Sequence, residues 1–136
     1  MNDMLSRLQM KVEINSDLTS EDIIHFQQML AYHKFALLPM DFINFLYKYN
    51  GLNHQGNIVC GIFYQDVYAD LLSLNERVKH PLHKDMVFLG YDTFDYLAYN
   101  QKYKCYQIID KTDFEVIEEY QDFASALQYI LKIEDE

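Results

Sequence analysis

The clearest alternation of hydrophobic and polar positions in this chain lies between Leu37 and Gly51. Four large hydrophobic residues recur there at the spacing of one helix face: Phe42, Phe45, Leu46 and Tyr49. Pro39 suits the first helical position, because its missing N–H would have no partner there in any case. Asn50-Gly51 supplies residues that tolerate the left-handed conformation that ends many helices. The pattern predicts a short buried helix from Pro39, and we expect the following sheet to pack against it.

Further amphipathic segments predict helices on both sides of this one. Thr19 and Asp22 have the spacing of a helix cap, and an apolar stripe follows over residues 20–34. A short helix is predicted over residues 69–78. Asp122 precedes a final apolar stripe and caps a predicted closing helix. At the start of the chain, the apolar positions Met4, Leu5, Leu8 and Val12 predict a weak helix or a loosely attached segment.

Segments rich in β-branched and aromatic residues lie between these helices. They predict strands over residues 58–64, 86–91, 96–99, 103–110 and 114–120, with a loop over residues 53–57. Tight turns separate the last three strands, which favours an antiparallel meander. The order is two or three helices, about five strands and a closing helix. Such segregation is typical of the α+β class, with N-terminal helices and a C-terminal helix packed on a mainly antiparallel sheet.

Length and hydropathy limit the class of protein. The 136 residues suit a single domain, and half of them are hydrophobic, which indicates a folded chain. No apolar run reaches the roughly 18 residues that span a bilayer. The first ten residues contain Asp3 and lack the apolar block of a secretory signal, so we expect a cytoplasmic protein. Cys60 and Cys105 lie in apolar segments, and we expect buried free thiols in a reducing compartment.

The formal net charge of −10 comes from 21 acidic residues and 11 Lys or Arg residues. This balance disfavours nucleic-acid binding, which needs a basic surface to displace counterions. It permits a basic protein partner that is attracted over a distance by electrostatic steering. Solubility alone would also account for the charge, so both interpretations stay open.

No motif in the sequence predicts catalysis, a cofactor or a metal ion. The four glycines lack the spacing of a phosphate loop. His80, His83 and Asp85 are metal-ligand types, but Pro81 prevents a regular helical pair and no cysteine lies nearby. A cysteine nucleophile needs an electropositive pocket, whereas both thiols have apolar neighbours. Carboxylate pairs are common, but nothing indicates a concave site that keeps one of them neutral.

Twelve tyrosines are interleaved with the acidic residues of the chain. Tyrosine provides a large contact area at little entropic cost, and it is enriched at protein interfaces. One interpretation is an acidic aromatic binding face; the other is that the rings fill the sheet surface and cover the edge of the core. Under the first interpretation, the predicted partner-binding residues are Asp66, Asp70, Tyr91, Asp92 and Asp95.

Four short motifs around the central helix resemble a known family. Leu38-Pro39, Asp41-Phe42, Phe45-Leu46 and Asn50-Gly51 match the Leu-Pro, acid-aromatic, Phe-Leu and Asn-Gly signature of the SUKH superfamily. Segment 95–110 resembles the family's hairpin, and segment 122–127 resembles its closing Phe-Ala-Ser helix. The similarity covers residues 20–133. The chain departs from the family in having no tryptophan, and in Tyr91–Asp95, where a more glycine-rich turn is common.

The superfamily includes fungal cell-wall-assembly regulators and many bacterial immunity proteins. The resemblance implies one α+β domain over residues 1–136, with its core at about 20–133, and a non-enzymatic binding function. For bacterial members it implies neutralisation of a cognate toxin, often a nuclease or deaminase. We expect a basic toxin domain as partner, with no nucleic acid, membrane or cofactor, and a monomer or weak homodimer. A regulatory or scaffold protein without a toxin partner is the alternative, followed by a small ligand-binding protein.

Overall fold

The computed structural model of the chain describes residues 17–78 and 85–133. In these ranges the elements are α2 (Ser20–Tyr32), α3 (Met40–Lys48), β1 (Leu52–His54), β2 (Asn57–Val59), α4 (Leu71–Arg77), β3 (Met86–Tyr91), β4 (Asp95–Asn100), β5 (Cys105–Asp110), β6 (Val116–Tyr120) and α5 (Phe123–Leu131). The α+β class is confirmed, with six strands in place of about five. The predicted segment 4–12 and the candidate ligands His80 and His83 lie outside the described residues.

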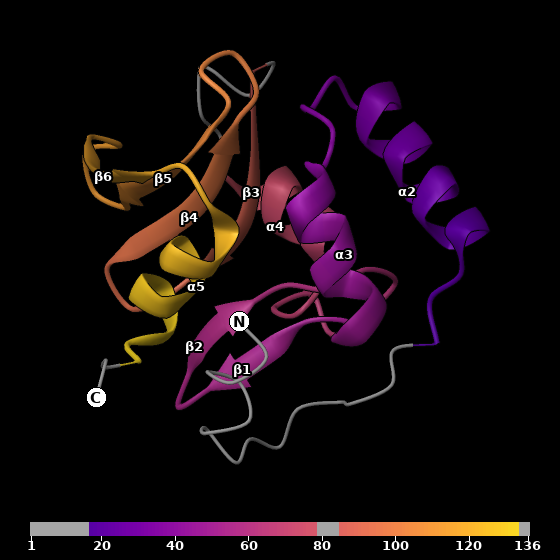
Figure 1. Cartoon of the computed structure of the whole chain (residues 1–136), viewed down its shortest axis with the longest axis horizontal. Coiled ribbons are helices and arrows are strands. Elements are labelled where there is room, and N and C mark those ends of the chain that lie inside the picture. The colour runs from indigo at the N-terminus through magenta and orange to yellow at the C-terminus, as the bar shows by residue number, and fades with distance from the viewer. Residues whose placement is uncertain (1–16, 79–84, 134–136) are drawn as a thin grey trace.

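The sheet is an antiparallel meander. Each strand pairs with the next strand along the chain, which gives the order β1-β2-β3-β4-β5-β6. In Figure 1, α4 lies beside β3, α3 and then α2 lie further out from the sheet, and α5 lies in front of β4. The sheet is therefore covered by elements from both ends of the chain.

The hairpin of β1 and β2 differs from the sequence prediction. Gln55 and Gly56 have φ angles of 54° and 87°, which suit the two-residue turn of a tight hairpin. The predicted loop at 53–57 therefore contains a strand and a turn, and the predicted strand at 58–64 ends at Val59. The prediction was wrong here because the chain reverses within the polar segment and then leaves the sheet.

The helix starts follow their capping residues. Thr19 and Asp22 form a reciprocal capping box, in which the Asp22 N–H donates to Thr19 Oγ1 and the Thr19 N–H donates to Asp22 Oδ2. Asp122 accepts from the Ser125 N–H at 3.0 Å and starts α5. Both predicted caps are confirmed. The central helix begins one residue later than expected, because Pro39 has an extended backbone and precedes the helix.

An aromatic cluster joins three elements in the core. The Phe123 ring of α5 lies 5.4 Å from the Phe42 ring and 5.1 Å from the Phe45 ring, both in α3. It also lies 5.5 Å from the Tyr106 ring of β5. All four side chains are buried, so burying them stabilises the contact between the central helix, the closing helix and the sheet.

Two further expectations concern the cysteines and the membrane. Cys60 and Cys105 are both free and buried, as the sequence predicts. Burial raises the pKa of Cys60 to about 12 and the pKa of Cys105 to about 11. Among the helices of the two described ranges, none combines the length and the apolar character that crossing a membrane requires.

Candidate binding surface

The five residues predicted to bind a partner fall into two classes by exposure. Asp70, Asp92 and Asp95 are buried, with exposed fractions of 7%, 3% and 7%. Asp66 is exposed and Tyr91 is half-buried. A buried carboxylate needs compensating partners, so the contacts of each buried acid decide what it does.

Asp70 organises the segment between β2 and α4. Its Oδ2 accepts from the N–H and the hydroxyl of Ser73, both at 3.0 Å, and so caps α4. Its Oδ1 accepts from the Tyr64 N–H at 3.1 Å. One carboxylate therefore fixes the start of a helix and one end of the preceding loop.

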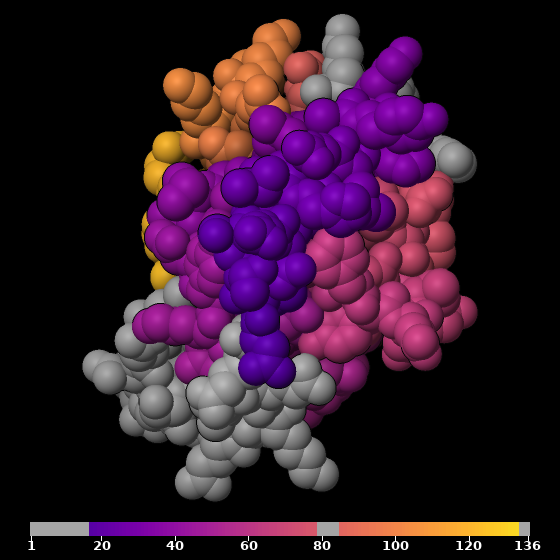
Figure 2. Space-filling model, turned by 90° about the vertical axis from the view of Figure 1, so that its right-hand side faces the viewer, coloured from indigo at the N-terminus to yellow at the C-terminus, as the bar shows by residue number. Residues whose placement is uncertain are grey.

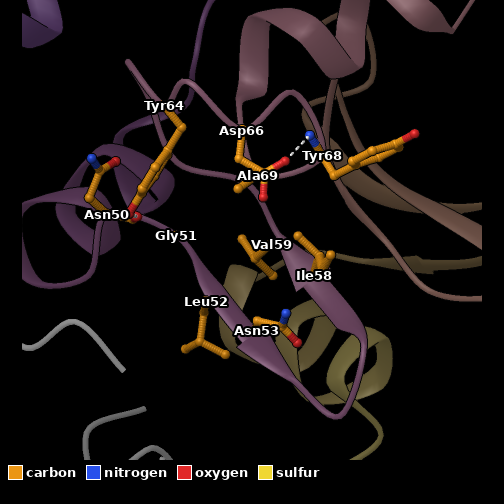
Figure 3. Close-up of a pocket in the computed structure, with 10 residues that line it drawn as sticks. All are labelled: Asn50, Gly51, Leu52, Asn53, Ile58, Val59, Tyr64, Asp66, Tyr68 and Ala69. Carbon is orange, nitrogen blue, oxygen red and sulfur yellow. Dashed lines mark hydrogen bonds between the residues drawn. The ribbon is translucent and has the colours of Figure 1, made fainter. Parts of the chain in front are cut away.

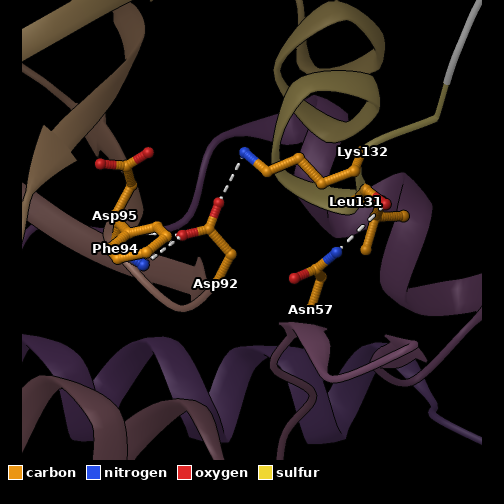
Figure 4. A network of polar contacts seen from close by, with 6 residues as sticks. All are labelled: Asn57, Asp92, Phe94, Asp95, Leu131 and Lys132. Atoms are coloured by element: carbon orange, nitrogen blue, oxygen red, sulfur yellow. Dashed lines mark hydrogen bonds and ion pairs between the residues drawn. The ribbon is translucent and has the colours of Figure 1, made fainter.

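Asp92 connects the β3–β4 turn to the end of α5 (Figure 4). Its Oδ1 accepts from the N–H groups of Phe94 and Asp95, at 2.8 Å and 2.7 Å. Its Oδ2 lies 2.8 Å from Lys132 Nζ, and Lys132 is the residue that ends α5, with a φ of 60°. The Asn57 amide donates to the Leu131 carbonyl oxygen at 3.4 Å and adds β2 to this network.

Asp95 lies opposite Asp110 in the register of β4 and β5. Burial, and next the charge of Asp92, raise the pKa of Asp95 above its ordinary value. Lys132 and Lys111 act in the opposite direction. The side chain is therefore a cost to the folded state at neutral pH, which is unlike the freely exposed acid that the sequence predicts.

A loop after β2 carries the exposed members of the predicted set. We name residues 62–69 the Tyr68 loop. Its neck is closed by two backbone hydrogen bonds, from Gly61 N–H to the Ala69 carbonyl at 3.0 Å and from Leu71 N–H to the Gly61 carbonyl at 2.8 Å. At its tip, Tyr68 is 62% exposed and Val67 is 48% exposed. Exposed apolar side chains on a short, closed loop are typical of binding loops.

The backbone of this tip is held from three directions. Arg77 Nη1 donates to the Val67 carbonyl at 2.6 Å, and its guanidinium carbon lies 5.3 Å from the centre of the Tyr68 ring. The Tyr91 hydroxyl donates to the Tyr68 carbonyl at 2.7 Å. The Tyr68 N–H donates to Asp66 Oδ1 at 2.9 Å. The loop thus presents its side chains from a fixed main chain.

The start of the loop lies against α2. Phe63 has a φ of 62°, which is strained for a bulky side chain, and it is 46% exposed. Its ring lies 5.8 Å from the Phe26 ring and 5.9 Å from the His25 ring. The space-filling view shows the segment that follows β2 lying beside α2 (Figure 2). The packing against α2 compensates for the strained backbone.

A hollow of about 190 Å³ lies between the Tyr68 loop and the β1–β2 hairpin (Figure 3). It is lined by Asn50, Gly51, Leu52, Asn53, Ile58, Val59, Tyr64, Asp66, Tyr68 and Ala69. Asp66 reaches toward it from above, with Oδ1 on the Tyr68 N–H. The hollow is small and open, and its size suits a single side chain of a partner more than a drug-sized ligand.

Other exposed acids lie outside the five predicted partner-binding residues. Segment 110–122 contains six acidic residues and one lysine. Glu115, Glu118 and Glu119 are exposed in or next to β6. Within residues 17–78 and 85–133, no three His, Cys, Asp or Glu side chains come together as metal ligands.

No family model matches the chain, and no curated protein matches it. The SUKH resemblance therefore rests on the motif residues alone, and in the fold these residues pack the core or hold a loop. Phe42, Phe45 and Leu46 are fully buried. Asn50 accepts from the Ile62 N–H at 2.7 Å and donates to the Ile62 carbonyl at 3.0 Å. These motif residues thus build the core and hold the start of the Tyr68 loop.

Proposed function

We propose that this chain is a non-enzymatic protein-binding domain, and that it acts as an immunity protein which neutralises a basic bacterial toxin of the nuclease or deaminase class. The toxin contacts the Tyr68 loop. Asp66 and Tyr68 touch the partner directly, whereas Asp70 and Tyr91 position the loop. Asp92 supports the neighbouring β3–β4 turn from inside the fold by accepting from the Phe94 and Asp95 N–H groups, and Asp95 is buried beside it.

The observation that carries this proposal is the fixed main chain beneath an exposed aromatic ring. Ordering a loop on binding costs free energy, and a loop that is already ordered avoids most of this cost. Arg77 and Tyr91 hold the carbonyl groups of Val67 and Tyr68, while the Tyr68 side chain stays 62% exposed. Tyrosine anchors of this kind dominate the binding energy of many interfaces.

Charge supports a basic partner. The net charge of −10 attracts a cationic protein over a distance and raises the association rate. Asp66 lies next to the anchor residue and borders the hollow, where it can meet a lysine or arginine of the partner. The SUKH resemblance supports the immunity role, because many bacterial members of that superfamily neutralise toxins.

The proposal is tested by capture and rescue. The tagged chain is expressed together with the products of adjacent genes, and bound proteins are identified by mass spectrometry. We expect a basic protein that arrests growth when expressed alone and loses this effect when the chain is present. Capture without rescue would favour a regulatory or scaffold protein, and failure of both would refute the proposal.

Two substitutions locate the surface once a partner is captured. Tyr68→Ala is expected to raise Kd at least tenfold, and Asp66→Lys is expected to slow association at low salt. Tyr103→Ala is the matched control, since Tyr103 is 64% exposed and has Lys102 Nζ at 5.5 Å from its ring centre. Equal effects of Tyr68→Ala and the control would show that the partner binds elsewhere.

A further inference from the structure

We propose that the outer edge of β6 (Val116–Tyr120) is a docking site for a basic, extended segment of a partner protein, which joins the sheet as a seventh strand. This inference stands apart from the proposed function, because it rests on a different surface and on different residues.

The edge is open in the structure. Among the described residues, β6 pairs only with β5 and is the last strand of the sheet. An edge strand has a row of backbone N–H and C=O groups directed away from the sheet, and these can pair with an added strand. Four of the five β6 residues are exposed, whereas the first five of the six β5 residues are buried.

The side chains of β6 offer contacts on both faces. Val116 and Ile117 are each 47% exposed, which is high for β-branched residues in a strand. The register shifts between Ile108 and Ile109, so that Ile109 pairs with Val116 and Ile108 with Glu118, and Ile117 has no counterpart on β5. Ile117 is therefore available to pack against the side chains of an added strand.

Charge decides which strand fits. Segment 110–122 has a formal charge of −5, from six acids and one lysine. That lysine, Lys111, is directed away from the edge: its Nζ lies 4.8 Å from the Tyr91 ring and 5.3 Å from the Tyr96 ring. Glu119 is oriented by Gln107, whose side-chain amide donates to Glu119 Oε2 at 2.8 Å. Within residues 17–78 and 85–133, the edge acids Glu115, Glu118 and Glu119 have no ion-pair partner, so this edge keeps a negative charge.

The same charges argue against a second copy of this chain as the occupant. Two antiparallel β6 strands would place Glu118 and Glu119 of one copy close to acidic residues of the other. Like charges on facing strands destabilise a sheet. A strand that alternates lysine or arginine with β-branched residues is instead attracted by the acids and packs on Val116 and Ile117.

The test uses the full chain and a synthetic peptide. The probe is acetyl-Lys-Val-Lys-Val-Lys-Val-amide, titrated into ¹⁵N-labelled protein and followed by amide chemical shifts and hydrogen exchange. We expect saturable shifts at residues 115–120 and slower exchange of their N–H groups. The same peptide with alternate N-methylated residues keeps its charge but cannot form the ladder, and we expect it to bind at least tenfold more weakly.

A pair of charge variants provides the control. Glu115→Lys with Glu118→Lys changes the formal net charge from −10 to −6, since each swap adds two, and is expected to raise Kd about tenfold. Glu21→Lys with Glu76→Lys makes the same change at exposed helix positions, and is expected to leave Kd within threefold. The proposal is overturned if shifts do not saturate, if they spread over the surface, or if both peptides or both variants behave alike.

Discussion

Asp92 holds the β3–β4 turn by hydrogen bonds and Lys132 by an ion pair, and two substitutions of Asp92 test these two contributions separately. Asp92→Asn keeps a carbonyl oxygen for the N–H groups of Phe94 and Asp95, but it removes the negative charge that faces Lys132. Asp92→Ala removes both. The difference between the two variants therefore isolates the hydrogen bonds of the turn from the ion pair.

The expected magnitudes follow from exposure and from the number of contacts. The Lys132 side chain is 50% exposed, so solvent screens the pair, and its loss in Asp92→Asn should cost about 1 kcal/mol or less. In Asp92→Ala two backbone N–H groups lose a charged acceptor. Hydrogen bonds to charged groups contribute about 1.5–3 kcal/mol each. Because the exposed turn can rehydrate in part, we expect a total loss of about 3 kcal/mol.

Urea unfolding measures both values. The chain has no tryptophan, so far-UV circular dichroism or tyrosine emission follows the transition. Lys132→Met, alone and combined with Asp92→Asn, gives the coupling energy of the ion pair directly. The assigned role of Asp92 would be refuted if the free energy of unfolding of Asp92→Ala lay within about 0.5 kcal/mol of the wild-type value. A difference of that size is typical of ordinary surface substitutions.

Three further outcomes are expected. Asn75→Ala should lower the free energy of unfolding in urea by about 3 kcal/mol, and a loss under about 1 kcal/mol would contradict this. The reason is that the buried Asn75 side chain accepts from the Phe88 N–H at 2.7 Å and donates to the Phe88 carbonyl at 2.9 Å. The pKa of Asp95 in the folded state lies above its ordinary value of 3.8, so ionisation of Asp95 lowers the stability of the fold as the pH rises through the folded pKa. Asp95→Asn should therefore raise the melting temperature at pH 7 and make it less pH-dependent. No gain in melting temperature would refute this role of Asp95. The raised pKa values of Cys60 and Cys105 predict that iodoacetamide at pH 8 labels neither thiol in the native protein and both in urea, as read by mass spectrometry; rapid native labelling would show that the thiols are accessible.

The helices were predictable because their caps and apolar stripes are local in sequence. Thr19 with Asp22 and Asp122 with Ser125 each start a helix where the sequence indicates. The hairpin of β1 and β2 was missed because Gln55-Gly56 is a weaker turn signal than Asn-Gly, and each strand is only three residues long. Local patterns therefore identify long amphipathic elements better than short strands.

The roles of the acidic residues were harder to predict. Asp70 lies at the start of the predicted short helix, as Asp122 precedes the closing helix, so its capping role had a signal in the sequence. Asp92 gave no such signal for its ion pair, because its partner Lys132 is far away along the chain. Burial of a carboxylate depends on the tertiary arrangement, and composition cannot report it.

The closed neck of the Tyr68 loop bears on how such a domain can evolve. Gly61 and its backbone partners at Ala69 and Leu71 join the loop to the fold, while residues 65–68 take no part in strand pairing. These positions lie outside the strands and the aromatic core, so we expect replacements at residues 65, 67 and 68 to leave the register of the sheet unchanged, whereas Asp66 also accepts from the Tyr68 N–H. Under the proposed function, new binding specificities would then arise by substitution at the tip, at little cost to folding, while the neck and its supports are kept.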